Sequence, residues 1–148
     1  MDADTVRAGL ARFIEGKTGR PWAIEGLTRL SGGASRETWS FDAIAADERI
    51  EAIFRCDPIP GVPSMPGRAL EYHLIKAAWD AGVVVPEPLW DGDETFDVKF
   101  FVMRRVPGET LGGRLVKGEQ YATARTTIPG QLATSLARIH TIHPEAHP

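Results

Sequence analysis

Apolar residues near the start of the chain recur at helical spacing and then give way to alternating apolar and polar positions. The helical pattern lies within residues 1–20, with Asp4 as the expected N-cap and Gly19 as the residue that ends the helix. Its apolar residues are Val6, Leu10, Phe13 and Ile14. Two strand-like runs follow, at 22–30 and 38–44, so the pattern predicts a leading helix and then a β-hairpin.

A third alternating run spans residues 50–56 and places Arg55 on the opposite face from Phe54 and Cys56. Prolines repeat through the segment 57–67 and exclude regular structure there, because they lack an N–H donor. A helix is predicted next, with an apolar face that we expect to pack on the sheet. The residues of this face are Leu70, Leu74, Ala77, Ala78 and Ala81.

The rest of the chain adds two strands and a final helix. A hairpin is predicted between residues 89 and 103, whereas glycines weaken the helical signal at 109–127. Pro129 is expected to open the last helix, whose apolar stripe is Leu132, Leu136 and Ile139. The order predicts an α+β fold: a five-stranded antiparallel sheet with one inserted helix, flanked by N- and C-terminal helices.

Composition narrows the classes of function. The chain of 148 residues has a formal net charge of -3, which argues against a nucleic-acid binder, because such proteins present strongly basic surfaces. Its basic residues are mostly arginine, which suits phosphate contacts and equally suits a bias in genomic base composition. A single cysteine, Cys56, excludes an internal disulfide. With no membrane-spanning run and an acidic start, we expect a cytoplasmic protein that does not bind membranes.

Small residues fill the turn of the first predicted hairpin. They are Ser31, Gly32, Gly33, Ala34 and Ser35. Without bulky side chains, the backbone N–H groups of such a turn can approach an anion such as a phosphate. Paired glycines between strands are equally typical of an ordinary turn, so this segment alone assigns no function.

Four segments in this order resemble the amino-terminal lobe of the aminoglycoside phosphotransferase and choline kinase-like family. They lie at residues 30–39, 52–55, 68–72 and 101–108, and correspond to the family's glycine-rich loop, third strand, glutamate-bearing helix and hinge. The family is a small-molecule branch of the protein-kinase-like fold. The chain departs from the protein-kinase pattern by having only two glycines in the loop and Arg55 in place of a lysine.

The resemblance implies a nucleotide site that binds ATP. The residues expected over the phosphates are Gly32, Gly33, Ala34, Ser35 and Arg36. Arg55 would pair with the α- and β-phosphates, and Glu71 would orient it through an ion pair. The carbonyl of Arg104 and the N–H of Val106 would hold adenine, between walls formed by Leu30, Ala52 and Met103. The alternative is that Arg55 and Glu71 are separate surface charges.

The resemblance also implies chemistry that these residues do not supply. The family needs a catalytic aspartate, and an asparagine and second aspartate for magnesium, but no aspartate follows Asp97 and the chain contains no asparagine. We therefore expect a nucleotide lobe at 1–106, and a hinge with the first helix of a second lobe at 107–148. The parent protein would use ATP and magnesium to phosphorylate the hydroxyl of a small molecule, and this chain alone would be inactive.

Two other interpretations are weighed against this one. A non-catalytic, kinase-like interaction module would pair with another chain, or with itself, through the apolar stripe of the C-terminal helix. A metal site at His140, His143 and His147 is disfavoured, because prolines interrupt the tail. Cys56 is interpreted as a small packing residue and not as a nucleophile.

Overall fold

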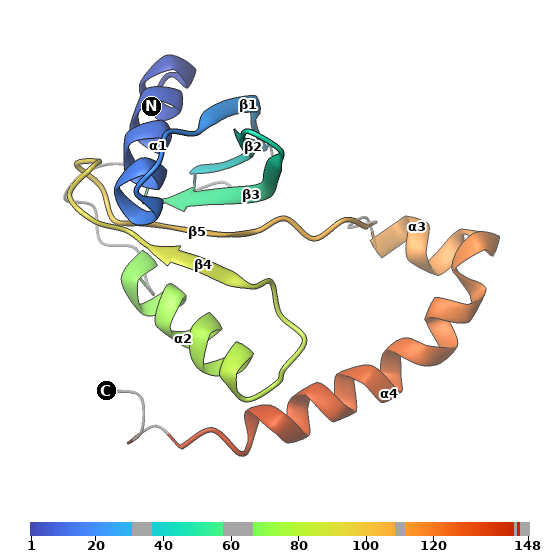
Figure 1. Ribbon diagram of the computed structural model, residues 1–148. Coiled ribbons are helices and arrows are strands. Elements are labelled where there is room, and N and C mark those ends of the chain that lie inside the picture. The colour runs from blue at the N-terminus through green and yellow to red at the C-terminus, as the bar shows by residue number, and fades with distance from the viewer. Residues whose placement is uncertain (31–36, 58–66, 109–111, 144, 146–148) are drawn as a thin grey trace.

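The computed structural model describes residues 1–30, 37–57, 67–108, 112–143 and 145. Its helices are α1 (Ala3–Thr18), α2 (Arg68–Asp80), α3 (Gly112–Lys117) and α4 (Ala122–Ile139), with a 3-10 helix η1 (Glu119–Tyr121). Its strands are β1 (Ala23–Arg29), β2 (Glu37–Ala45), β3 (Glu48–Cys56), β4 (Pro88–Asp91) and β5 (Phe100–Arg104). Figure 1 shows their arrangement, which confirms the α+β fold and the helix inserted after the third strand.

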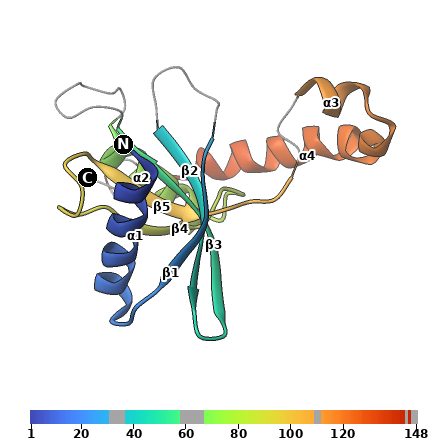
Figure 2. The same ribbon diagram turned by 90° about the horizontal axis from the view of Figure 1, so that it is seen from above.

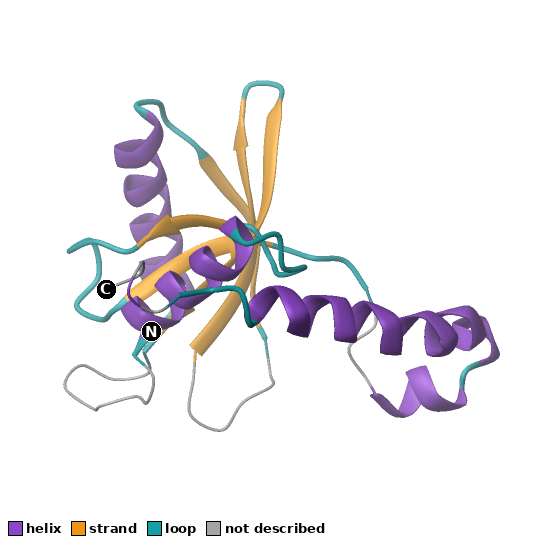
Figure 3. Ribbon diagram, turned by 90° about the horizontal axis from the view of Figure 1, so that it is seen from below, coloured by secondary structure: helices purple, strands orange, loops and turns teal. Residues whose placement is uncertain are grey.

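The five strands form one antiparallel sheet in the order β1-β2-β3-β5-β4. Helix α1 covers one face, which we call the α1 face and which carries Phe54 and Phe100. Helix α2 lies across the other face beside β4 and β5 (Figure 3), and we call this side, with Arg55 and Phe101, the α2 face. The sheet therefore separates the hydrophobic core on the α1 face from the charged side chain of Arg55 on the α2 face.

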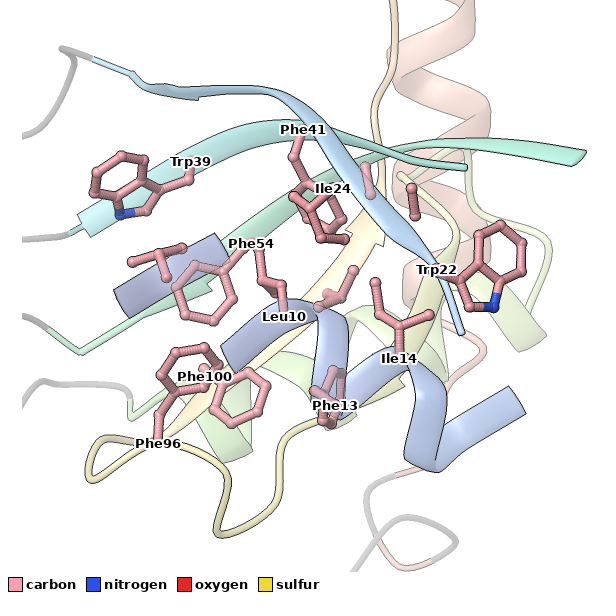
Figure 4. Packing of buried hydrophobic residues seen from close by; sticks show 14 of the residues in the cluster. Leu10, Phe13, Ile14, Trp22, Ile24, Trp39, Phe41, Phe54, Phe96 and Phe100 are labelled. Carbon is pink, nitrogen blue, oxygen red and sulfur yellow. The ribbon is translucent and has the colours of Figure 1, made fainter. Parts of the chain in front are cut away.

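The core lies between α1 and the sheet (Figure 4). The ring of Phe13 packs edge-on against that of Phe100, with centroids 4.9 Å apart. The ring of Phe54 lies 5.1 Å from that of Phe96 and 5.4 Å from that of Phe100. These contacts join the leading helix, the middle strand and the β4–β5 connection, so α1 is an integral part of the sheet domain.

The predicted first helix is confirmed, with a change at its start. Asp2 is the N-cap instead of Asp4, and its carboxylate accepts a hydrogen bond of 2.9 Å from the backbone N–H of Thr5. Asp4 falls inside the first turn, where its negative charge favours the positive end of the helix dipole. Gly19 ends the helix with φ 75°, as expected from its freedom to adopt a left-handed conformation.

The predicted packing face of α2 is confirmed at Ala77, which is 5% exposed, but is wrong for its two leucines. Leu70 and Leu74 are 53% and 56% exposed, so neither holds the helix to the sheet. The side that faces the sheet instead carries Glu71 and Tyr72, whose ring centroid lies 6.1 Å from that of Phe101. Neighbouring helical positions differ by about 100°, so a helix that turns Glu71 toward the sheet turns the adjacent leucine away.

The predicted start of the last helix is also wrong, because α4 begins at Ala122 and contains Pro129 in its interior. A proline inside a helix removes one N–H donor and disfavours the helix without always ending it. Within the fully described segment from α3 to α4 no residue is buried. Helix α3 lies away from the sheet, and α4 runs back from it (Figure 2), so that Arg138 near its end donates to the backbone oxygen of Gly82 after α2. A partner for the apolar stripe of α4 stays a prediction, as does the boundary near residue 106.

Among the described residues, no helix has the length and apolar character needed to cross a lipid bilayer.

Gly92, which follows β4, should be intolerant of a side chain. A Cβ atom there would lie 2.3 Å from the backbone oxygen of Phe100, which cannot move without distorting the hairpin. Gly92→Ala should therefore lower the free energy of unfolding by about 1–3 kcal/mol, as overpacking does, measured by urea denaturation. The matched control is Gly16→Ala in α1, where nothing lies within 4 Å and alanine should stabilise the helix by about 1 kcal/mol. Equal effects of the two variants would contradict this prediction.

Candidate functional site

The structure brings Arg55 and Glu71 together across the α2 face. Arg55 lies on β3 and points away from the core, as the alternation of the strand predicts. Its Nη1 atom lies 2.5 Å from Oε1 of Glu71, which comes from the first turn of α2. The side chains are 24% and 15% exposed, so the pair is mostly shielded from solvent. The two residues are therefore not separate surface charges.

A second guanidinium, which the sequence analysis missed, holds the other oxygen of Glu71. Arg68 pairs through Nη1 with Oε2 of Glu71, and its side chain is fully buried. Its Nε atom lies 3.8 Å from Oδ1 of Asp57. Two arginines and two carboxylates thus balance each other in charge, as buried charges must. The i, i+3 spacing of Arg68 and Glu71 is the sequence signal that could have revealed the contact.

Arg55 keeps hydrogen-bonding capacity beyond its ion pair. Its Nε atom is buried, and among the described residues none accepts a hydrogen bond from it. The centre of its guanidinium lies 5.9 Å from the ring centroid of Phe101, so an aromatic face supports the cation. A guanidinium fixed on one side by a carboxylate can still donate to the oxygens of an anion on the other side.

Met103 lies on the α2 face, but Ala52 does not. The register pairs Met103 with Ile53, and both share the face of Arg55. Ala52 is fully buried in the core on the α1 face, so its expected role as a wall is wrong. Side chains alternate along a strand, so the wall residue must be an even number of positions from Arg55. Ile53 fits this requirement.

The predicted hinge residues follow the end of β5. Arg104 contacts Glu87 twice. Its backbone N–H donates to the backbone oxygen of Glu87 at 2.9 Å, and its side-chain Nε lies 2.5 Å from a carboxylate oxygen of Glu87. The N–H of Arg105 donates to the oxygen of Glu51 at 2.9 Å. Val106 comes after this bond and is 64% exposed. Val106 therefore lies beyond the end of the sheet.

Gly32, Gly33, Ala34, Ser35 and Arg36 lie outside the described residues. The two strands that flank them are joined by a buried carboxylate that the sequence analysis missed. Glu37 begins β2, is 5% exposed, and has an oxygen 3.1 Å from Nη2 of Arg29 at the end of β1. The α-amino group of Met1 lies 3.0 Å from the same carboxylate. The Arg29–Glu37 ion pair therefore fixes the two ends of the hairpin relative to each other.

Cys56 is a packing residue in this structure. Its side chain is fully buried on the α1 face, where burial and then the charge of Glu37 raise the pKa of the thiol from 9.0 to about 12. Among the described residues there is also no group of three His, Cys, Asp or Glu placed to hold a metal ion. His147 lies outside the described residues.

The raised pKa of Cys56 predicts a pH dependence of stability. Between about pH 9 and about pH 12 the folded thiol keeps a proton that the unfolded thiol has released. The free energy of unfolding should therefore fall as pH rises through this range, and Cys56→Ala should show a shallower fall in pH-dependent urea denaturation. The native thiol should also resist a disulfide reagent at about pH 8 and react in denaturant. Rapid labelling of the native protein would contradict the burial.

Comparison with known proteins agrees with the fold. A family model described as the phosphotransferase enzyme family matches residues 26–148, which begin inside β1 and include the other four strands, α2 and the segment after β5. A search of curated proteins found no match. The family match confirms the resemblance to the aminoglycoside phosphotransferase and choline kinase-like family, and the antiparallel sheet with its inserted helix is that of a kinase-like amino-terminal lobe. The chain therefore belongs to the phosphotransferase enzyme family.

Proposed function

We propose that this chain is the ATP-binding lobe of a phosphotransferase that moves the γ-phosphate of ATP to the hydroxyl of a small molecule. The observation that carries the proposal is the 2.5 Å ion pair between Arg55 and Glu71. In kinase-like enzymes a basic residue of the third strand pairs with the nucleotide phosphates and is held by a carboxylate of the next helix. In this chain β3 supplies the basic residue, Arg55, and α2 supplies the carboxylate, Glu71.

The chemistry follows from holding a cation in place before the nucleotide arrives. Phosphoryl transfer depends on positioning and charge stabilisation, because the protein forms little covalent chemistry of its own with the phosphate. Glu71 fixes the direction of the Arg55 guanidinium, and Arg68 fixes Glu71. The α- and β-phosphate oxygens would accept hydrogen bonds from the remaining donors of Arg55. Little reorganisation is then needed when the nucleotide binds.

The remaining parts of the nucleotide have complementary groups along the same face. Backbone N–H groups of residues 32–36 would approach the phosphates from the β1–β2 hairpin. Adenine would lie at the end of β5, where the carbonyl of Arg104 and the N–H of Val106 offer one acceptor and one donor. Met103 and Ile53 would provide apolar contact from the sheet.

The catalytic step needs an aspartate that accepts the hydroxyl proton of the substrate. The last aspartate, Asp97, lies between β4 and β5 close to Phe96, whose ring belongs to the core on the α1 face. Arg55 lies on the opposite face. The described residues also offer no group of three His, Cys, Asp or Glu side chains that could hold magnesium. We expect the chain alone to bind ATP without transferring its phosphate.

A titration of the isotope-labelled chain with ATP, followed by amide chemical shifts, tests the proposal. The shifts should concentrate at Gly32, Gly33, Arg55 and Val106. Adenosine should move the amide of Val106 but not that of Arg55, because it lacks phosphates. No shift at ATP concentrations of about 1 mM, a usual upper limit for substrate affinity, would overturn the proposal, as would shifts confined to α1.

A further inference from the structure

A polar network joins the hinge to the α2 face of the sheet. Arg105, the residue after β5, donates from Nη1 to Oγ of Ser40 at 2.8 Å and from Nη2 to Oδ1 of Asp42 at 2.9 Å. Its Nη2 atom also lies 3.0 Å from Oε1 of Glu51. Arg49 shares both carboxylates, at 2.7 Å from Asp42 and 3.6 Å from Glu51. The hinge is therefore tied to β2 and β3 at once.

The contacts of Arg105 are better shielded than an ordinary surface ion pair. Its side chain is 28% exposed and that of Asp42 is 13% exposed, so water screens their attraction only in part. The backbone N–H of Arg105 is held as well, by the oxygen of Glu51 at 2.9 Å. The main chain of Arg105 is thus fixed to β3, and its side chain is fixed to β2 and β3 by bonds that include charge-assisted ones.

We propose that Arg105 is a positioning residue for the adenine ring, an inference that rests on the proposed function. Residue 105 lies between the two groups assigned to adenine, the carbonyl of Arg104 and the N–H of Val106. Rotation of the chain at residue 105 would turn these groups away from the base. The tie to β2 and β3 prevents that rotation, so the hinge presents a fixed acceptor and donor before the nucleotide binds.

Base discrimination reports this positioning directly. The exocyclic amino group of adenine donates to a carbonyl, and ring atom N1 accepts from an N–H. Hypoxanthine, the base of ITP, has an oxygen in place of that amino group and a hydrogen on N1, so both contacts fail. A hinge with fixed peptide groups should reject ITP, because a site built to hydrogen-bond its ligand leaves polar groups unpaired with the wrong one.

The test is calorimetric titration of the whole chain with ATP and with ITP. The wild type should prefer ATP, and Arg105→Met should lower the ratio of the two affinities about tenfold, the scale of one hydrogen bond. The matched control is Arg20→Met, which removes an exposed arginine that pairs with Glu48 and shares no partner with Arg105. It should change the ratio less than about twofold, because it leaves the hinge contacts in place. General destabilisation would weaken both nucleotides alike and leave the ratio unchanged.

The outcomes separate this inference from the proposed function. An unchanged ratio in Arg105→Met, or a wild type that binds ATP and ITP equally, overturns the role of Arg105 but not ATP binding. A wild type that binds neither nucleotide overturns the proposed function itself. If Arg105→Met fails to fold, Ser40→Ala removes a single acceptor of the network and should lower the ratio by a smaller factor. An unchanged ratio in that variant also overturns the inference.

Discussion

Replacing Phe54 with alanine should lower the free energy of unfolding by about 3–5 kcal/mol, the cost of deleting a buried aromatic side chain. Phe54 is fully buried on β3, and its ring contacts those of Phe96 and Phe100. Its loss opens a cavity where the middle strand, the β4–β5 connection and the α1 core meet. Because small domains have about 5–15 kcal/mol in total, a loss of this size removes a large fraction of the stability. Urea denaturation followed by circular dichroism measures the change.

Leu74→Ala is the control for this prediction. Leu74 is 56% exposed on α2, so its truncation should cost less than about 0.5 kcal/mol, as surface substitutions do. The comparison also tests the orientation of α2, because the sequence pattern placed Leu74 against the sheet. A large loss of stability in Leu74→Ala, or a small one in Phe54→Ala, would contradict the packing described for the two faces.

Hydrophobic periodicity predicts helices and strands well where one face of the element is buried and the other is exposed to solvent. The alternation around Phe54 and Arg55 shows this, because the strand has a core on one side and a polar surface on the other. The pattern of α2 failed for the opposite reason. Its leucines suggested an apolar packing face, but the charges of Arg68 and Glu71 decide which side meets the sheet. A window of sequence contains no information on ion pairs with a distant strand.

The same limit explains what was found and missed at the candidate site. Arg55 and Glu71 could be expected from the order of motifs, since a resemblance carries tertiary information that periodicity lacks. The contacts of Arg105 with Ser40 and Asp42 join residues more than sixty positions apart, so no local pattern indicates them. The motif predicts Ala52 as a wall of the adenine site, whereas the alternation of its strand places it in the core, where the structure has it. In that case the geometry of the strand was the better guide than the motif.

Replacing Arg55 with methionine should weaken ATP binding by about 10- to 150-fold, because charge-assisted hydrogen bonds to a phosphate contribute about 1.5–3 kcal/mol. Methionine keeps much of the apolar length of the side chain and removes the guanidinium. The affinity for adenosine should stay the same within about twofold, since adenosine has no phosphate to lose. Calorimetric titration with both ligands measures the two affinities on one preparation of protein.

The matched control is Arg49→Met, which removes an arginine from the same strand and the same face of the sheet. Arg49 is 57% exposed and pairs with Asp42 and Glu51. It lies near the opposite end of β3 from Arg55. If only net charge attracted the nucleotide, the two variants would lose ATP affinity equally, and the loss would shrink with added salt. If the pair with Glu71 holds a specific phosphate contact, only Arg55→Met should lose affinity. Loss of adenosine binding in Arg55→Met would instead indicate damage to the fold and contradict the assigned role.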